Sequence, residues 1–218
     1  MIADRIRVLI VDDDPMAAAG IGAVLGTDAG IDVVGRCTDG DEVHDAIVHL
    51  RPDIVLCDVR MPRMDGVAVV ESLHERGPRF LMMTAFGDDR HVLDAVAAGA
   101  AGFLLKDEDP TRILDAVHDV AAGDAAFSPR SARQLIAWVH ESHTADARRD
   151  AIAKIDLLTD RERQFALALV TGASDAELAA QFYVAETTVK SALSAIKTKW
   201  GVRNRTQIAV IVARSGLA

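Results

Sequence analysis

The sequence is poor in cysteine and has no long apolar run. Its 218 residues include two cysteines, Cys37 and Cys57. Both lie in strand-like apolar runs, which favours small buried side chains over a disulfide and indicates a reducing compartment. No apolar stretch approaches the roughly 20 residues of a membrane span, and the first residues lack the layout of a signal peptide. We therefore expect a cytoplasmic protein that makes no contact with a membrane.

Basic residues are scarce in the first part of the chain. Residues 1–128 contain 11 Lys and Arg against 24 Asp and Glu, a net charge of −13. Residues 129–155 contain 5 basic and 3 acidic residues, and residues 156–218 contain 8 basic and 6 acidic residues, so each segment has a net charge of +2. This asymmetry favours an acidic front domain, whose charge a metal ion would partly neutralise, and a tail domain suited to a polyanion.

Apolar strand-like runs alternate with helical patterns over the first 122 residues. Pro15 suits the first turn of a helix that Asp14 can cap. The alternation predicts an α/β fold with a doubly wound, five-stranded parallel sheet. The expected strands are 6–11, 32–36, 54–57, 80–83 and 102–105, and the expected helices are 15–26, 41–50, 67–76, 88–98 and 110–122.

Chemically active side chains stand where four of these strands end. Asp12 and Asp13 follow the first strand, Asp58 the third, Thr84 the fourth and Lys106 the fifth. Ligands of open parallel sheets bind at this edge. Three carboxylates placed together there need a cation, and hard oxygen ligands suit Mg²⁺. A metal beside a carboxylate, a lysine and a hydroxyl is typical of phosphoryl transfer, with Asp58 as the nucleophile that forms an acyl phosphate.

Each of these residues has an ordinary explanation when it is taken alone. An aspartate at a strand end usually caps a helix or stabilises a turn, and a lysine is commonly a solvated surface residue. Their coincidence at four strand ends favours a site.

With these residues the chain resembles a response-regulator receiver domain, a flavodoxin-like fold, over about residues 5–122 of a domain spanning 1–125. Met61-Pro62 and Gly66 match the loop after the phosphoacceptor, and Phe103 matches the switch aromatic. The resemblance implies that a sensor histidine kinase phosphorylates Asp58, and that Thr84 and Phe103 then move inward. It also implies that the protein is a phosphoacceptor and not an enzyme, because it catalyses only its own phosphorylation and dephosphorylation. The implied Mg²⁺ ligands are Asp12, Asp13, Asp58 and the backbone carbonyl of Arg60.

Two further regions follow the expected receiver. Residues 126–155 are expected to form a linker with a helix at 130–141 and a polar stretch at 140–150. Residues 156–218 have the pattern of four short helices, with capping-box spacings at Thr159–Glu162 and Ser174–Glu177. A three-residue turn at 183–185 precedes the third helix, 186–200, and predicts an all-α helix-turn-helix domain.

The third of these helices separates into two faces. Val189, Leu193, Ile196 and Trp200 have the spacing of a core stripe. The rest is small or cationic, which suits either a solvated face or a helix that enters a DNA major groove. The candidate DNA-binding residues are Thr187, Thr188, Lys190, Ser191, Ser194 and Lys197.

The tail resembles the LuxR-type DNA-binding domain. The matching segments are Leu158-Thr159-x-Arg161-Glu162, Ala176-Glu177-Leu178-Ala179, Thr187-Thr188-Val189-Lys190, Lys199 and Gly201-Val202-Arg203. With the receiver, the whole chain resembles a NarL/FixJ-family response regulator, which implies double-stranded DNA, RNA polymerase and a second copy of the chain as candidate partners. The chain departs from the family pattern at Ala185, Ala192, Ser194 and Trp200, which leaves the operator sequence open.

Two other functions remain open at this point. Asp12-x-Asp14 with Thr84 and Lys106 also resembles a haloacid-dehalogenase-type phosphatase, which would hydrolyse free phosphate esters. That reading leaves the Asp58 segment and the tail unexplained. The other alternative is a receiver that responds to protein contact without phosphorylation, against which the complete set of site residues argues.

The last helix, 205–214, is expected to supply a dimer contact. With Ile208 at the centre of the buried face, Val210 lies roughly opposite, at about 100° per residue. An exposed Val210 between short neighbours would form a two-fold patch on the DNA-bound protein.

Overall fold

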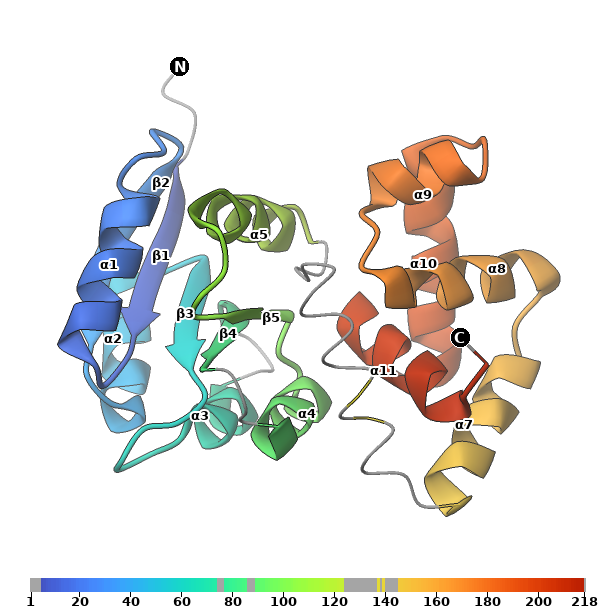
Figure 1. Cartoon of the computed structure of the whole chain (residues 1–218), viewed down its shortest axis with the longest axis horizontal. Helices are drawn as coiled ribbons and strands as arrows, with labels where there is room; N and C mark the ends of the chain where they lie inside the picture. Colours follow the sequence, from blue (N-terminus) through green and yellow to red (C-terminus); the bar gives the residue numbers. More distant parts are fainter. Residues whose placement is uncertain are drawn as a thin grey trace. The chain divides into compact units, whose positions relative to one another are not determined.

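The structure is a computed structural model that describes residues 5–73, 77–85, 89–123, 137, 139 and 145–217. The chain divides into two compact units, residues 1–126 and 127–218 (Figure 1). Among the described residues, no helix combines the length and apolarity that a membrane crossing requires.

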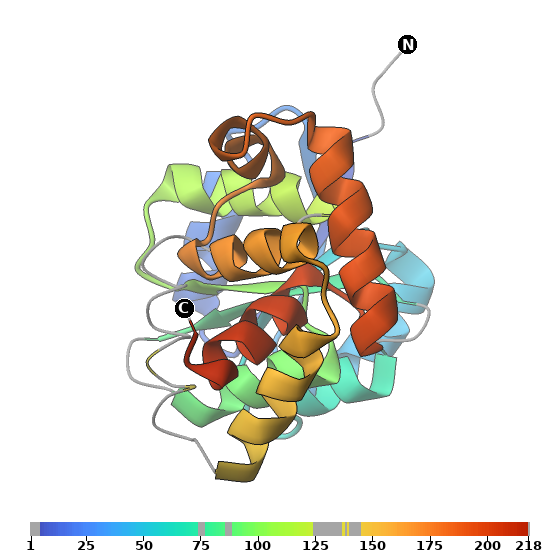
Figure 2. The same ribbon diagram turned by 90° about the vertical axis from the view of Figure 1, so that its right-hand side faces the viewer.

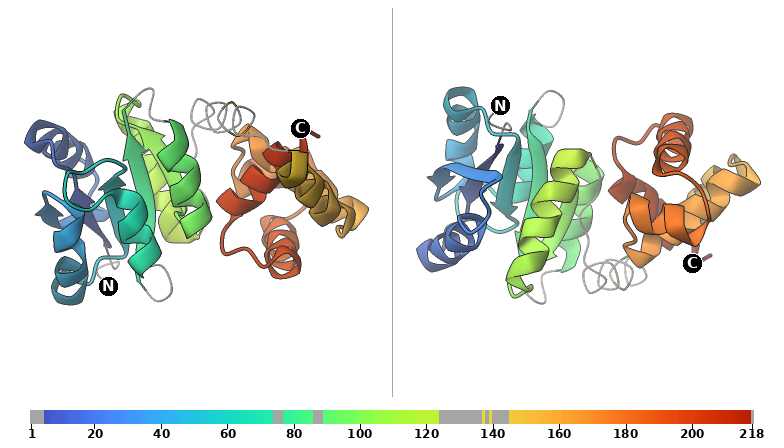
Figure 3. Two further views of the ribbon diagram at one scale, coloured as in Figure 1. Left: turned by 90° about the horizontal axis from the view of Figure 1, so that it is seen from below. Right: turned by 90° about the horizontal axis from the view of Figure 1, so that it is seen from above.

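The first unit is the predicted five-stranded parallel sheet. Its strands lie in the order β2-β1-β3-β4-β5, as a doubly wound sheet requires. Helices flank the sheet in the views of Figure 3. The strands are β1 (Ile6–Val11), β2 (Ile31–Cys37), β3 (Ile54–Asp58), β4 (Arg79–Thr84) and β5 (Gly102–Leu105), and the helices are α1 (Pro15–Leu25), α2 (Val43–Leu50), α3 (Gly66–Leu73), α4 (Asp89–Ala98) and α5 (Pro110–Ala122).

The register brings the carboxyl ends of the strands to one edge. Val11 pairs with Cys57, Asp58 with Met83, and Thr84 with Leu105. Residues that follow the strands in sequence therefore meet at this edge, as the alternating pattern predicted.

The cores and caps follow from the apolar spacing. Ile21 and Leu25 of α1 and Val117 and Val120 of α5 pack with the strands in one apolar cluster. Asp14 caps α1 by accepting a hydrogen bond from the backbone N–H of Met16 at 2.8 Å, as expected. The expected helix at 41–50 begins instead as a 3₁₀ turn, η1 (Gly40–Glu42).

The two cysteines are free and buried, as expected. Burial raises the pKa of Cys37 to about 11, so that thiol stays protonated at neutral pH.

The second unit is helical throughout its described elements (Figure 2). Both predicted capping boxes are present: the backbone N–H groups of Thr159 and Ser174 donate to Glu162 and Glu177 at 2.8 and 2.7 Å. The predicted core stripe of α10 is buried. The elements are α7 (Ala145–Asp156), α8 (Asp160–Ala168), η2 (Leu169–Thr171), α9 (Asp175–Gln181), α10 (Glu186–Trp200) and α11 (Arg205–Ser215).

Residues 140–150 were interpreted from the sequence as a polar part of the linker, but from residue 145 onward they belong to the helix α7. Two apolar residues one turn apart, Ala151 and Ile155, are buried and join the apolar cluster of the second unit. The indole N–H of Trp200 donates to the carbonyl of Lys154 at 2.8 Å, and Arg148 donates to the carbonyl of Ser215 at 3.2 Å. The helix expected at 130–141 lies outside the described residues, apart from 137 and 139, which are helical.

The expectation of an exposed Val210 is also wrong. Its side chain is 5% exposed, and its neighbours Thr206 and Ala213 are 0% and 1% exposed. The helical wheel placed these residues opposite Ile208 correctly, but α11 is buried on more than one side along its length. The predicted dimer contact through Val210 concerns the DNA-bound protein and stays a prediction.

Candidate functional site

The predicted carboxylates meet at the carboxyl edge of the sheet. Asp12 and Asp13 follow β1, and Asp58 ends β3. One oxygen from each lies within 4.8 Å of the others. Asp12 and Asp58 are buried, at 1% and 7% exposure, whereas Asp13 is exposed. Two of the three carboxylates are therefore buried at the edge of the sheet, and the third is open to solvent.

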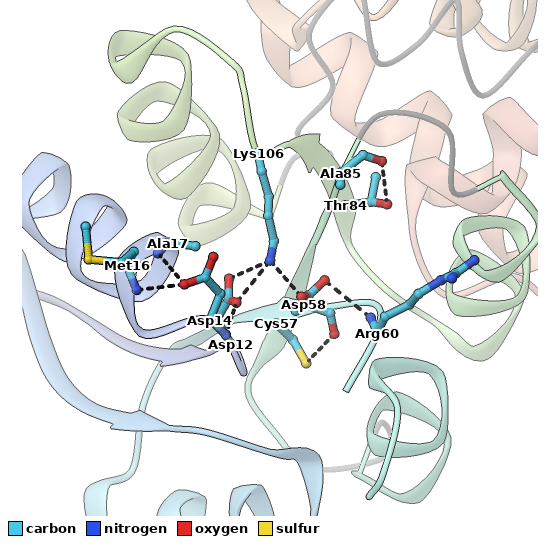
Figure 4. A network of polar contacts seen from close by, with 10 residues as sticks. All are labelled: Asp12, Asp14, Met16, Ala17, Cys57, Asp58, Arg60, Thr84, Ala85 and Lys106. Carbon is cyan, nitrogen blue, oxygen red and sulfur yellow. Dashed lines mark hydrogen bonds and ion pairs between the residues drawn. The ribbon is translucent and has the colours of Figure 1, made fainter. Parts of the chain in front are cut away.

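Lys106, which follows β5, joins two of these carboxylates (Figure 4). Its Nζ lies 2.7 Å from Asp58 Oδ2 and 2.8 Å from Asp12 Oδ2. Burial alone would lower the pKa of Lys106, but the bonds to the two carboxylates raise it above its ordinary value. Burial also raises the pKa of Asp58, and Lys106 opposes that shift. The ammonium thus stays charged and holds Asp58 toward Asp12.

The residues present fit a divalent cation. Three carboxylates against one ammonium leave two negative charges when all are ionised. Asp12 Oδ2 is buried and accepts no hydrogen bond, although Lys106 Nζ lies beside it. The same ammonium donates to the other oxygen, Asp12 Oδ1, at 3.0 Å, and carboxylate oxygens are the ligands that small hard cations prefer.

The loop after β3 passes along the open side of the cluster. The backbone N–H of Arg60 donates to Asp58 Oδ1 at 3.3 Å. A hollow of about 490 Å³ lies there, lined by Asp13, Val59, Arg60, Met61, Pro62 and Asp65. This hollow gives solvent and ligands a route to the exposed Asp13.

The two predicted switch residues are buried in this structure. Thr84 ends β4 at 1% exposure, and its hydroxyl donates to the carbonyl of Ala85 at 3.1 Å (Figure 4). Phe103 of β5 is fully buried. Their movement on phosphorylation stays a prediction.

Sequence reasoning missed Asp39, which follows β2, the strand judged to carry nothing chemical. Asp39 is 2% exposed and accepts hydrogen bonds from the backbone N–H groups of Arg63 and Met64, at 3.0 and 2.9 Å. Its partners lie 24 and 25 residues away, so no local motif could have revealed the contact.

The candidate DNA-binding residues form the outer face of α10. Thr187, Thr188, Lys190, Ser191 and Ser194 are exposed, and Lys197 is half-buried. Ala185, at the N-cap, makes no side-chain hydrogen bond to this helix. The departure noted in the sequence therefore leaves the N-terminus of α10 without a side-chain cap.

Two cations of the tail hold the domain together. Lys199, part of the LuxR-type resemblance, lies 2.6 Å from Glu162, whose carboxylate also completes the capping box of α8. Arg205 forms a buried pair with Asp175 at 2.8 Å.

Comparisons with known proteins agree with this geometry. Residues 8–118 match the response regulator receiver domain, and residues 156–212 match the luxR family of bacterial regulatory proteins. The chain belongs to the NarL/FixJ family of response regulators. The chain has the receiver domain and the DNA-binding domain of a two-component transcriptional regulator. These two domains imply a kinase and DNA as partners.

Relatives match this response regulator along its whole length. The DNA-binding transcriptional activator DevR/DosR of Mycobacterium tuberculosis is 34% identical over 94% of this chain and 93% of its own. The uncharacterized transcriptional regulatory protein YxjL of Bacillus subtilis is 30% identical over 100% and 99%. Among solved structures, the response regulator ChrA of a heme-sensing two-component system is 32% identical, with a TM-score of 0.56 over 98% of this chain and 99% of that one.

Proposed function

We propose that Asp58 accepts a phosphoryl group from a sensor histidine kinase, and that this modification controls DNA binding by the tail unit. The observation that carries the proposal is Lys106, whose Nζ bridges Asp58 and Asp12 at 2.7 and 2.8 Å. A lysine held between two carboxylates at the carboxyl edge of the sheet is placed to neutralise the negative charge of a phosphoryl group that is transferred to one of them.

The chemistry is a transfer from nitrogen to oxygen. An Asp58 carboxylate oxygen attacks phosphorus, the P–N bond of the kinase phosphohistidine breaks, and an acyl phosphate forms. Asp12, Asp13, Asp58 and the Arg60 carbonyl would hold a Mg²⁺ ion, which would supply positive charge near the phosphoryl oxygens. Lys106 contributes a second positive charge from the end of β5. Hydrolysis of the acyl phosphate reverses the signal, and these two reactions are the protein's only catalysis.

In the tail unit, the exposed face of α10 is the proposed contact to the DNA major groove. Lys190 can donate to guanine, and Thr187, Ser191 and Ser194 can donate to bases or phosphates. The tail has few cations, so we propose that a homodimer on two half-sites supplies the needed contacts. The regulator acts in the cytoplasm, with RNA polymerase as the proposed downstream partner.

Intact-mass measurement tests the phosphoacceptor. The protein is incubated with acetyl phosphate, with Mg²⁺ or with a chelator. We expect one phosphoryl adduct on the wild type with Mg²⁺, and none on Asp58→Asn. The matched control is Asp53→Asn, because Asp53 precedes the same strand and bonds the backbone N–H of Arg7 at 2.9 Å.

A full adduct on Asp58→Asn would contradict the assignment. Turnover of free phosphate esters by the purified protein would instead support the phosphatase alternative.

A further inference from the structure

The loop between β3 and α3, residues 59–65, holds the proposed cation ligand that does not come from a side chain. The two ends of the loop are joined by a hydrogen bond, in which the backbone N–H of Gly66 donates to the carbonyl of Val59 at 3.0 Å. Gly66 lies so close to Asp58 that a Cβ there would collide with the Asp58 carbonyl oxygen. One end of the loop is thereby fixed against the phosphoacceptor strand.

The outer part of the loop is held by Asp39. Its Oδ1 accepts from the N–H groups of Gly40 and Met64 at 2.8 and 2.9 Å, and its Oδ2 accepts from the N–H of Arg63 at 3.0 Å. The approach is tight, because a Cβ on Gly40 would collide with the Met64 carbonyl oxygen. Burial alone would raise the pKa of Asp39, but these N–H donors outweigh it and the pKa lies below its ordinary value. The carboxylate is therefore an ionised, buried anchor.

We propose that Asp39 is a positioning residue for the cation site, because it fixes the loop that carries the Arg60 carbonyl. The proposal rests on the proposed function, since the Arg60 carbonyl matters only if a cation binds beside Asp58. Asp39 acts through backbone hydrogen bonds rather than by touching the cation. Residues that orient metal ligands typically change metal affinity by about 10–100-fold when they are removed.

The side chain of Arg63 offers a way to separate two parts of this contact. It reaches Asp39 at 3.4 Å, Asp41 at 3.0 Å and Glu42 at 2.7 Å, but it is 55% exposed. Exposed ion pairs contribute little, whereas the backbone N–H bonds to Asp39 remain when this side chain is removed. Arg63→Ala therefore tests the ion pairs alone.

The experiment is a calorimetric titration of the full-length protein with MgCl₂, without a phosphodonor. We expect Asp39→Ala to weaken Mg²⁺ binding by at least about tenfold. Asp39→Asn keeps one acceptor oxygen and should fall between that variant and the wild type. Arg63→Ala should bind within about twofold of the wild type, because the backbone bonds persist.

The matched control is Asp28→Ala. Asp28 precedes β2, whereas Asp39 follows it. Like Asp39, Asp28 accepts a hydrogen bond from a backbone N–H, that of Gly30, at 2.7 Å. Its carboxylate also lies 2.8 Å from the side chain of His118. It lies before the strand rather than at the carboxyl edge. A loss of Mg²⁺ affinity through general loosening of the unit would appear in both variants, and a positioning effect only at Asp39.

A second measurement follows acetyl phosphate labelling against Mg²⁺ concentration. Asp39→Ala should raise the half-saturating Mg²⁺ concentration while the rate at saturating Mg²⁺ stays within about twofold, because Asp58, Asp12 and Lys106 are untouched. If Asp39→Ala does not fold, judged by circular dichroism, Asp39→Asn carries the same test.

Wild-type affinity in a folded Asp39 variant would overturn the proposal, as would an equal loss in Asp28→Ala or Arg63→Ala. Absence of Mg²⁺ binding by the wild type would overturn the proposed function itself, and the positioning role with it.

Discussion

We expect that replacing Asp175 lowers the free energy of unfolding of the DNA-binding unit far more than any other single change to the polar groups of that unit. Asp175 opens α9, and its partner Arg205 opens α11, so the pair ties the helix-turn-helix to the last helix. Arg205 Nη1 donates to Asp175 Oδ1 at 2.8 Å, and Nη2 donates to the carbonyl of Ala173 at 2.6 Å. The two side chains are 7% and 4% exposed.

The magnitude follows from the charge that remains. Asp175→Ala removes the carboxylate that lies 2.8 Å from the buried Arg205 guanidinium, and breaking a buried pair in this way costs about 3–5 kcal/mol. The retained bond to Ala173 lowers this cost, while loss of an acidic residue from the first turn of α9 adds about 0.3–1 kcal/mol. We expect a total near 3–4 kcal/mol, a large share of the roughly 5–15 kcal/mol that stabilises a typical domain.

Urea unfolding followed by tryptophan fluorescence measures this effect in the full chain. Both tryptophans, Trp138 and Trp200, belong to the unit of residues 127–218, so the signal reports on that unit. The double variant Asp175→Ala/Arg205→Met removes both charges and should recover part of the loss. A loss below about 1 kcal/mol for Asp175→Ala, or simple additivity in the double variant, would refute the reasoning.

Two further predictions concern the tail unit. Lys190→Ala should weaken operator binding by about 1–3 kcal/mol. The control is Arg149→Ala, which changes an exposed cation of α7 and should leave binding unaffected. An equal loss of affinity in both variants, in titrations at fixed salt, would contradict a contact between Lys190 and the groove. The second prediction concerns pH, because Lys199 holds the pKa of Glu162 below its ordinary 4.5. A lowered pKa stabilises the fold above the ordinary value, and this stabilisation is lost as the pH falls through the lowered pKa. Glu162→Gln should therefore flatten the fall of tail-unit stability below about pH 4.5, measured by the same fluorescence. The other capping-box variant, Glu177→Gln, is the control, and an identical effect there would contradict the role of Lys199.

Local patterns in the sequence determined the architecture and most of the candidate phosphorylation site. Strand and helix spacing places Asp12, Asp58 and Lys106 after strands, and a parallel sheet must bring the carboxyl ends of its strands to one edge. The two capping boxes and the core stripe of α10 were equally predictable. Each depends on residues three or four apart, whose geometry a helix alone sets.

Contacts between residues far apart in the sequence were decided only by the tertiary structure. Asp39 meets Met64 across 25 residues, Glu162 meets Lys199 across 37, and Asp175 meets Arg205 across 30. The burial of Val210 and the helix α7 belong to the same class, because a helical wheel gives the direction of a side chain but not what covers it. A buried charge needs a partner, yet which partner it finds depends on how the elements pack, and no local spacing encodes that.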